Sequence, residues 1–208
     1  MIELKYIDNT YSNEIVILKS RFITSIYKVS SIDEVNLILA SVRKKYYDAS
    51  HNCYAYILGD NAEIQKCSDD GEPQKTAGFP ILDVFKKNEI TNVLCIVTRY
   101  FGGTLLGAGG LVRAYSESAS KCLLKAKLFI KKELNTLIVR LDYSSYNTLL
   151  SQIGDTVILD TSYAADITLK LACEKDLLNS LITKINNISS GNALIEDAGP
   201  YMTFAPIN

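Results

Sequence analysis

The segment with the clearest chemical potential is rich in glycine. Between Arg99 and Tyr115 the sequence reads RYFGGTLLGAGGLVRAY, after an apolar run and before a helical pattern. Its glycines are Gly102, Gly103, Gly107, Gly109 and Gly110. A strand, a glycine-rich turn and the start of a helix together direct several backbone N–H groups at one place, which is how many proteins hold anions. The residue types therefore favour an anion site, with phosphate as the natural ligand.

Two familiar phosphate-binding motifs do not fit this segment. Ala108 stands where a Walker A motif needs lysine, and no register yields the G-x-G-x-x-G of a dinucleotide fold. A competing interpretation is that the glycines only let a helix lie tightly against a sheet. The sequence does not decide whether these glycines form an anion site or only allow close packing of the helix on the sheet.

A second group of polar residues lies in the segment SDDGEPQKTAGFP, residues 68–80. Asp69, Asp70 and Glu72 fall within four residues, beside Lys75 and Thr76. Such carboxylates could place a general base or hold a divalent cation, but the ligand spacing of an EF-hand is missing. A solvated acidic turn, in which the aspartates accept nearby N–H groups, explains the same residues. No metal and no cofactor are predicted.

The only histidine, His51, opens the apolar run HNCYAYIL. A lone histidine at the start of a strand is usually structural, although with Asp69 or Asp70 it could form an acid/base pair. Cys53 should point to the same side of the strand, which makes a Cys/His nucleophile a weaker alternative. The catalytic candidates are thus His51, Asp69, Asp70 and Glu72.

Composition limits the classes of function. The chain has 208 residues, of which 48 % are hydrophobic and 22 % charged, and a net charge of −1. These values predict a folded protein. It lacks the overall positive charge that a protein needs to coat a polyanion. Residues 1–130 hold 16 Lys and Arg against 14 Asp and Glu, whereas residues 131–208 hold 6 against 9. A polyanion would bind the first half.

Cysteine usage and hydropathy indicate a compartment. Five cysteines occur without a C-x-x-C pair, which disfavours a disulfide framework and a zinc ribbon. No apolar run is long enough for a membrane span, and the first residues do not read as a signal peptide. These features predict a cytoplasmic protein that does not bind a membrane.

The elements that would position these residues follow from hydrophobic periodicity. In the first half the pattern predicts one or two strands in 15–29, a helix opened by a capping box at Ser31 and Glu34, and strands at 51–58 and 62–67. The first half continues with a predicted loop over 68–80 and a short helix at about 80–88. It ends with a central strand, NVLCIVTRY, and a helix that stops at about 126.

The pattern restarts in KAKLFIKKEL, residues 125–134, so we place a domain boundary there, giving domains 1–128 and 129–208. The second half predicts strand 134–142, helix 143–153, strands 156–163 and 165–173, helix 174–188, strand 192–197 and a short segment at 201–205. This βαββαβ order is typical of the ferredoxin-like arrangement. The fold class is α+β with two domains.

Three ordered motifs resemble the signatures of the YigZ/IMPACT family. They are HNCYAY from His51, DDGEP with TAGFP between Asp69 and residue 80, and TRYFGG with LGAGGL and AY up to Tyr115. The resemblance implies a first domain with the βαβ-type fold of several ribosomal proteins, and a ferredoxin-like second domain similar to the C-terminal part of elongation factor G. The signature positions are His51, Asp69, Asp70, Gly71, Glu72, Arg99 and the five glycines.

The resemblance says little about a partner. It implies that eukaryotic relatives inhibit a starvation-sensing arm of translational control by binding a regulator. They use an additional domain that this sequence lacks, so that partner is not carried over.

Together these observations favour a cytoplasmic, translation-associated regulator that binds RNA or ribosomal components through a glycine-rich, anion-binding cleft. Lys75, Thr76, Arg99 and Arg113 would contact the ligand with the glycines. The alternative is a hydrolase acting on a phosphorylated or nucleotide substrate, with His51 and an aspartate as the acid/base pair. A third is a protein-interaction module that docks through the ferredoxin-like domain. The sequence does not decide whether the protein is an enzyme, nor its oligomeric state.

Overall fold

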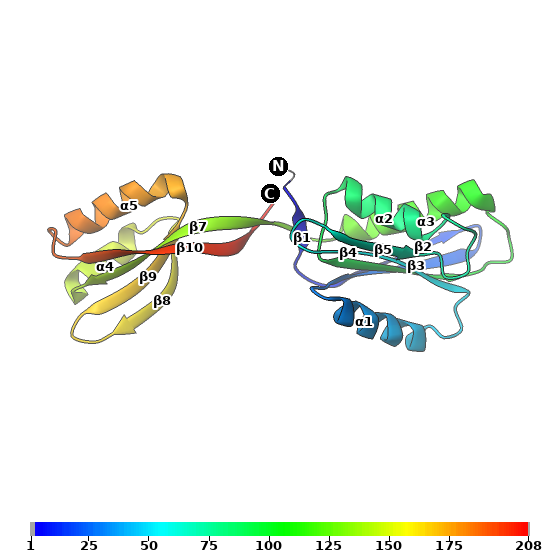
Figure 1. Ribbon diagram of the computed structural model, residues 1–208, viewed down its shortest axis with the longest axis horizontal. Coiled ribbons are helices and arrows are strands. Elements are labelled where there is room, and N and C mark those ends of the chain that lie inside the picture. Colours follow the sequence, from blue (N-terminus) through cyan, green and yellow to red (C-terminus); the bar gives the residue numbers. More distant parts are fainter. Residues whose placement is uncertain (1–2, 208) are drawn as a thin grey trace. The chain divides into compact units, whose positions relative to one another are not determined.

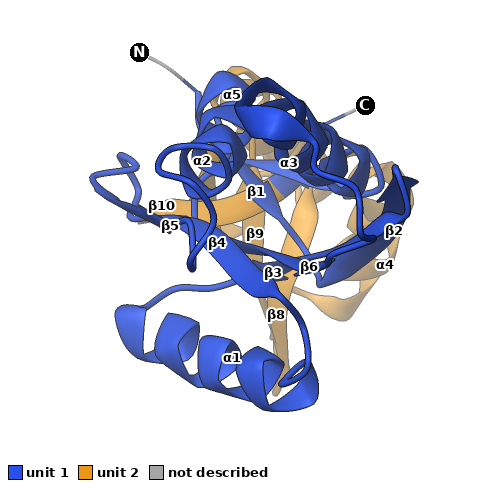
Figure 2. Cartoon of the chain, turned by 90° about the vertical axis from the view of Figure 1, so that its right-hand side faces the viewer, with its two compact units in different colours: residues 1–130, 205–208 blue, residues 131–204 orange. Residues whose placement is uncertain are grey.

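The computed structural model describes residues 3–207. The chain divides into two compact units, unit 1 with residues 1–130 and 205–208 and unit 2 with residues 131–204 (Figure 2). The architecture is α+β in both units. No helix among the described residues is long and apolar enough to cross a membrane.

Unit 1 is built on a five-stranded sheet in the order β2-β3-β6-β4-β5, in which all neighbours are antiparallel. Its strands are β2 (Tyr11–Ile17), β3 (Ser20–Lys28), β4 (His51–Leu58), β5 (Ile64–Ser68) and β6 (Val93–Tyr100). β6 lies at the centre and is buried from Val93 to Arg99, as its continuous apolar run predicts. A short strand, β1 (Lys5–Ile7), pairs outside this sheet with residues 128–130.

Helices cover both faces of this sheet (Figure 1). The helices of unit 1 are α1 (Ile32–Lys45), α2 (Gly78–Lys87) and α3 (Gly107–Leu123). α1 packs on one face, where Leu94 and Ile96 of β6 meet its apolar side. α2 and α3 pack on the other face, where Cys95 and Val97 join their core. The alternation of side chains along β6 therefore supplies two separate cores.

Side-chain hydrogen bonds explain where two of the helices of unit 1 begin. α1 begins at the predicted capping box, since the Ser31 hydroxyl accepts the N–H of Glu34 at 3.2 Å. α2 begins two residues before the predicted position, because a distant carboxylate accepts the N–H groups of Ala77 and Gly78. Pro80 then falls in the first turn, where its missing N–H is harmless.

Unit 2 has the predicted βαββαβ order. It contains residues 131–141 of β7 (Leu128–Leu141), α4 (Tyr143–Gln152), β8 (Val157–Tyr163), β9 (Ile167–Cys173), α5 (Lys175–Ile188) and β10 (Leu194–Pro206). The strand order β10-β7-β9-β8 is that of a ferredoxin-like sheet. Leu149 of α4 and Leu181 and Ile185 of α5 pack on Val139 and Leu169 of this sheet.

The sequence prediction lacks β1, and its largest differences from the structure lie at β7 and β10. β7 begins at Leu128, and the half-buried residues Lys131 and Lys132 belong to the strand instead of forming a loop. β10 is continuous through the segment predicted as separate. Gly199 takes a φ of +79° inside β10, and the Thr136 hydroxyl donates to its carbonyl at 2.6 Å. The positive φ of Gly199 therefore does not end the strand.

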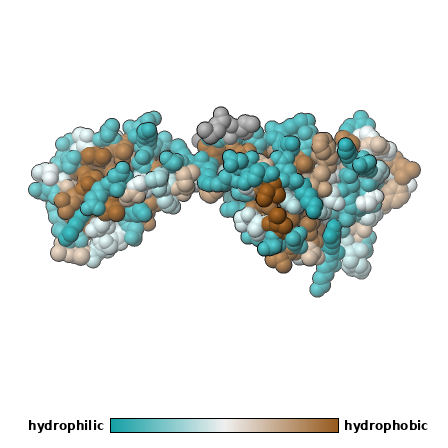
Figure 3. All heavy atoms as spheres, viewed as in Figure 1, coloured by the Kyte–Doolittle hydropathy of each residue, from teal (hydrophilic) through white to brown (hydrophobic). Residues whose placement is uncertain are grey.

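The visible surface in Figure 3 is mostly hydrophilic, with apolar side chains in separate patches. Exposed apolar residues in unit 1 include Leu105 at the turn before α3 and Phe101 at the end of β6.

Replacing Ser31 with alanine tests the cap of α1. Ser31→Ala removes the acceptor for the Glu34 N–H, so we expect the free energy of unfolding to fall by about 1 kcal/mol. Urea denaturation followed by circular dichroism measures it. Ser41→Ala is the control, because Ser41 is exposed inside the same helix, where alanine should stabilise by about 0.5 kcal/mol. Equal effects of both changes would contradict the assigned cap.

Candidate functional site

A cavity of about 520 Å³ lies in unit 1 where four segments meet. These are the start of β4, the loop after β5, the end of β6 and the turn into α3. The antiparallel register places His51 of β4 directly opposite Arg99 of β6, so the sheet itself brings the two basic side chains together. Leu105, Leu106 and Phe101 supply an apolar wall.

A buried ion pair forms the floor of this cavity. Arg99 is 4 % exposed, and its Nη1 donates to Glu72 Oε1 at 2.6 Å. The same carboxylate oxygen accepts the hydroxyl of Tyr115 at 2.8 Å. The guanidinium lies 5.4 Å from the ring of Phe22 and 5.5 Å from that of Phe101. Glu72 therefore ties the loop after β5 to β6 and α3.

His51 stands beside this pair. Its Nδ1 lies 2.9 Å from the carbonyl oxygen of Asp70, and its Nε2 lies 3.9 Å from Glu72 Oε2. Gly71 lies against the imidazole, because a Cβ there would sit 3.4 Å from Nδ1. The loop thus holds the ring in a fixed position at the cavity.

The two aspartates of the loop bind backbone groups. Asp69 accepts the N–H groups of Lys75, Ala77 and Gly78 at 2.8, 3.0 and 2.9 Å. Asp70 accepts the N–H of Asn52 at 2.7 Å. Neither carboxylate lines the cavity. Their geometry is that of residues that shape the loop and cap α2.

The glycine-rich segment has more than one role. At Gly102 an added Cβ would lie 2.1 Å from the backbone of Lys19, so this glycine permits close packing against the β2–β3 turn. Gly107 has a φ of +70°, and, apart from its chain neighbours and the backbone of α3 itself, no described atom lies within 4 Å of a Cβ placed there or at Gly109. α3 begins without a capping side chain among the described residues. Its first N–H groups therefore lack a side-chain acceptor there.

Cys53 does not suit a nucleophile. Burial raises the pKa of its thiol far above the ordinary value, so the thiol stays protonated at neutral pH. Its Sγ donates to the carbonyl of Asp69 at 2.9 Å and lies 3.3 Å from the Tyr115 hydroxyl. Burial also raises the pKa of Tyr115, which keeps its hydroxyl a donor to Glu72. These contacts describe a structural donor and give no support to the Cys/His alternative.

The structure brings together only some of the residues that the sequence singled out. His51, Glu72, Arg99 and Gly107 line the cavity. The candidates outside its lining are Asp69, Asp70, Lys75, Thr76, Gly102, Gly103, Gly109, Gly110 and Arg113. Thr76 is buried, and its hydroxyl donates to the carbonyl of Pro73 at 2.6 Å. Lys75 and Arg113 are exposed and form no ion pair with any described residue.

The sequence analysis does not identify two hydrogen-bond partners of the buried ion pair. Tyr115 enters it only as the last residue of the third motif, although a buried tyrosine hydroxyl needs a partner and so signals a polar group nearby. Ser20 gave no signal, because its contact with Arg99 Nη2, at 3.3 Å, joins residues 79 positions apart.

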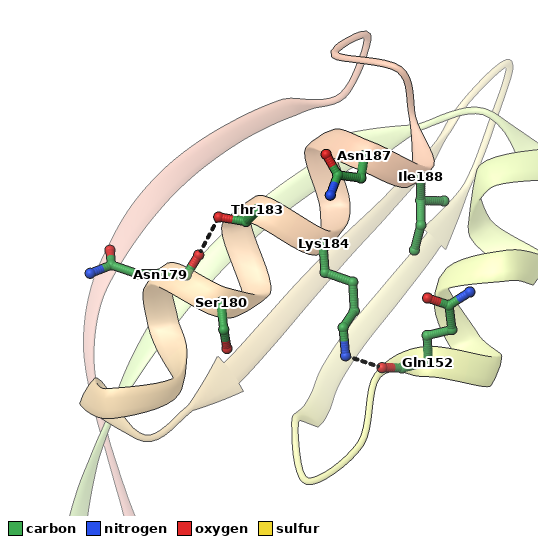
Figure 4. A pocket seen from close by; sticks show the side chains of 7 residues that line it. All are labelled: Gln152, Asn179, Ser180, Thr183, Lys184, Asn187 and Ile188. Carbon is green, nitrogen blue, oxygen red and sulfur yellow. Dashed lines mark hydrogen bonds between the residues drawn. The ribbon is translucent and has the colours of Figure 1, made fainter.

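A second hollow, of about 550 Å³, lies in unit 2 along α5 (Figure 4). Neutral polar side chains dominate its lining. Its one charged side chain, Lys184, donates to the carbonyl of Gln152 at 2.7 Å, and the Thr183 hydroxyl donates to the carbonyl of Asn179 at 2.9 Å. Because these groups bond the helices' own backbone, the cavity of unit 1 is the stronger candidate site.

Comparison with known proteins identifies both halves of the chain. Residues 18–123 match the Impact N-terminal domain, and residues 139–192 match a domain of unknown function, DUF1949. The chain is 35 % identical to IMPACT family member YvyE of Bacillus subtilis, over 89 % of this chain and 86 % of that protein. It is 31 % identical to IMPACT family member YigZ of Escherichia coli, over 85 % and 88 %. A crystal structure of a hypothetical protein, 28 % identical, matches 94 % of this chain and 97 % of that one with a TM-score of 0.60.

A double-mutant cycle tests the buried ion pair. Arg99→Met leaves the Glu72 carboxylate buried without its cation, so we expect the free energy of unfolding to fall by about 3–5 kcal/mol. Arg99→Met combined with Glu72→Met removes both charges and should lose clearly less than the two single changes added together. Urea denaturation measures all three variants. Strictly additive losses would show that the two side chains are not coupled.

Proposed function

Because the chain belongs to the IMPACT family, we propose that it is a translation-associated regulator that binds RNA or a ribosomal component through unit 1. The translational part of this proposal comes from the family resemblance, which implies regulators of translation among its eukaryotic members. The binding part comes from the cavity and from the start of α3.

The observation that carries the binding role is the open N-terminus of α3 at the edge of the cavity. No side chain in the described part of the chain caps this helix, and Gly107 and Ala108 line the cavity. The first N–H groups of a helix lack intrahelical partners and favour a negative charge. A phosphate oxygen would satisfy them. The cavity volume of about 520 Å³ is within the range of small-ligand sites.

We assign the phosphate contacts to cations other than Arg99. The guanidinium of Arg99 is almost fully buried and neutralised by Glu72, so its role is to fix the structure of the cavity floor. Lys75, in the loop that borders the cavity, and Arg113, on α3, are exposed and have no acidic partner among the described residues. These two side chains can meet a polyanion without breaking an ion pair.

The same geometry supports binding over hydrolysis. The hydrolase alternative needs Asp69 or Asp70 beside His51 as the acid/base pair. Asp69 is occupied by three backbone N–H groups, and Asp70 by the Asn52 N–H and by Arg43 at 3.4 Å. Neither carboxylate lines the cavity, so neither faces a ligand bound there.

A methyl group at Gly109 tests the role of the helix start. Because Cβ atoms point toward the helix N-terminus, Gly109→Ala would place a methyl where a phosphate approaches. We expect weaker binding of a ten-nucleotide RNA pool of random sequence, measured by fluorescence anisotropy. We also expect the free energy of unfolding to stay the same or to rise by up to about 1 kcal/mol.

Gly107→Ala is the matched control for conformation. The φ of +70° at Gly107 makes any side chain strained, so this change should lower the free energy of unfolding by about 1 kcal/mol. A stable Gly109→Ala protein that binds the RNA pool as tightly as the parent would overturn the assigned phosphate site.

Salt dependence tests the free cation on α3. Arg113→Gln removes one phosphate contact, so the slope of log affinity against log salt should become shallower by about one unit. Lys121→Gln on the same helix is the control, because Lys121 pairs with Glu117 at 2.7 Å. If both variants keep the parental slope, Arg113 does not contact the RNA.

A further inference from the structure

With the His51 imidazole neutral, the floor of the cavity presents two hydrogen-bond acceptors side by side. His51 Nδ1 lies 2.9 Å from the carbonyl oxygen of Asp70. A carbonyl oxygen can only accept, so Nδ1 must carry the hydrogen. In the neutral ring Nε2 therefore has none and is itself an acceptor.

Glu72 supplies the second acceptor. Its Oε1 receives the two hydrogen bonds from Arg99 and Tyr115. Its Oε2 accepts no hydrogen bond from any described residue, and its polar neighbour is His51 Nε2 at 3.9 Å. The side chain is only 3 % exposed. Opposite a neutral imidazole this oxygen has no donor among the described residues, so a ligand or solvent must supply one.

The surroundings of this acceptor pair indicate what kind of donor it meets. The first N–H groups of α3 favour a phosphate, and the wall of Phe101, Leu105 and Leu106 favours an apolar or planar group. A ligand that combines a phosphate, a planar base and a hydroxyl donor is a ribonucleotide. A hydroxyl placed between Nε2 and Oε2 can donate to either atom.

We propose that His51 Nε2 and Glu72 Oε2 receive the 2′-hydroxyl of a ribonucleotide, so that the cavity selects RNA over DNA. This inference rests on the proposed nucleic-acid binding by unit 1 and adds the basis of its selectivity. The 2′-hydroxyl is the group by which proteins distinguish the two nucleic acids at a given site. A deoxyribose in the cavity would cover both acceptors without giving them a hydrogen, which disfavours its binding.

Three versions of one probe test this selectivity with the full chain. The probes are ten-nucleotide pools of random sequence made of RNA, of DNA and of 2′-O-methyl RNA, and fluorescence anisotropy measures their affinity at one salt concentration. We expect RNA to bind about tenfold more tightly than either of the other two. The methylated pool is decisive, because it keeps an RNA-like sugar but lacks the O–H donor.

Each result has a distinct meaning. Equal affinity for RNA and DNA would overturn the hydroxyl site and leave the proposed nucleic-acid binding intact. Equal affinity for RNA and 2′-O-methyl RNA would also overturn it, because recognition would then depend on shape. If none of the three pools binds, the proposed function itself fails, and this inference fails with it.

A variant and a competitor complete the test. His51→Phe keeps a ring but removes the Nε2 acceptor, so the preference for RNA over DNA should fall toward one. Unchanged selectivity in a folded variant would contradict the proposal, and the three pools decide the matter if the variant does not fold. Ribonucleoside monophosphates that displace the RNA pool better than their deoxy forms would support a free nucleotide as the source. Displacement by RNA strands alone would support a strand.

Discussion

The contact on which the rest of unit 1 depends is the ion pair between Arg99 and Glu72. A carboxylate and a guanidinium that are both almost fully buried must stay together, because either charge alone would be strongly unfavourable there. This requirement fixes the loop after β5 against the end of β6. It also orients the Tyr115 hydroxyl and places His51 at hydrogen-bonding distance from the loop backbone. The site is therefore rigid on its floor, and its open side is the turn into α3.

The sheet explains why such a site can exist at the end of a central strand. β6 supplies apolar side chains to two cores on opposite faces, so its position is set by packing along most of its length. Arg99 stands near the end of this fixed strand, opposite His51 in the register. α1 covers the face that lacks the cavity, whereas α2 and α3 cover the face that has it. One face of the sheet thus stabilises unit 1 and the other also carries the site.

The parts of the structure that could be predicted from sequence are those whose cause is local. Ser31 and Glu34 mark the start of α1 within four residues, and the periodicities of unit 2 suffice for its ferredoxin-like order. The start of α2 could not be placed, because its cap is Asp69, eight residues before Ala77. β10 runs on through Gly199, whose carbonyl accepts the hydroxyl of Thr136, 63 positions away, and such a contact leaves no local signal. For the site, residue types selected His51, Glu72 and Arg99, but only the three-dimensional structure shows that Asp69 and Asp70 serve the backbone.

The distribution of thiols along the fold has a practical consequence. Four of the five cysteines are buried, and Cys67 alone is partly exposed. It lies at the end of β5, two residues before the aspartate that organises the loop at the cavity. Thiol reagents react with accessible thiolates, so they should modify this position first. The native chain therefore carries its own attachment point for a spectroscopic label, four residues before Gly71, which lines the cavity, and needs no engineered cysteine.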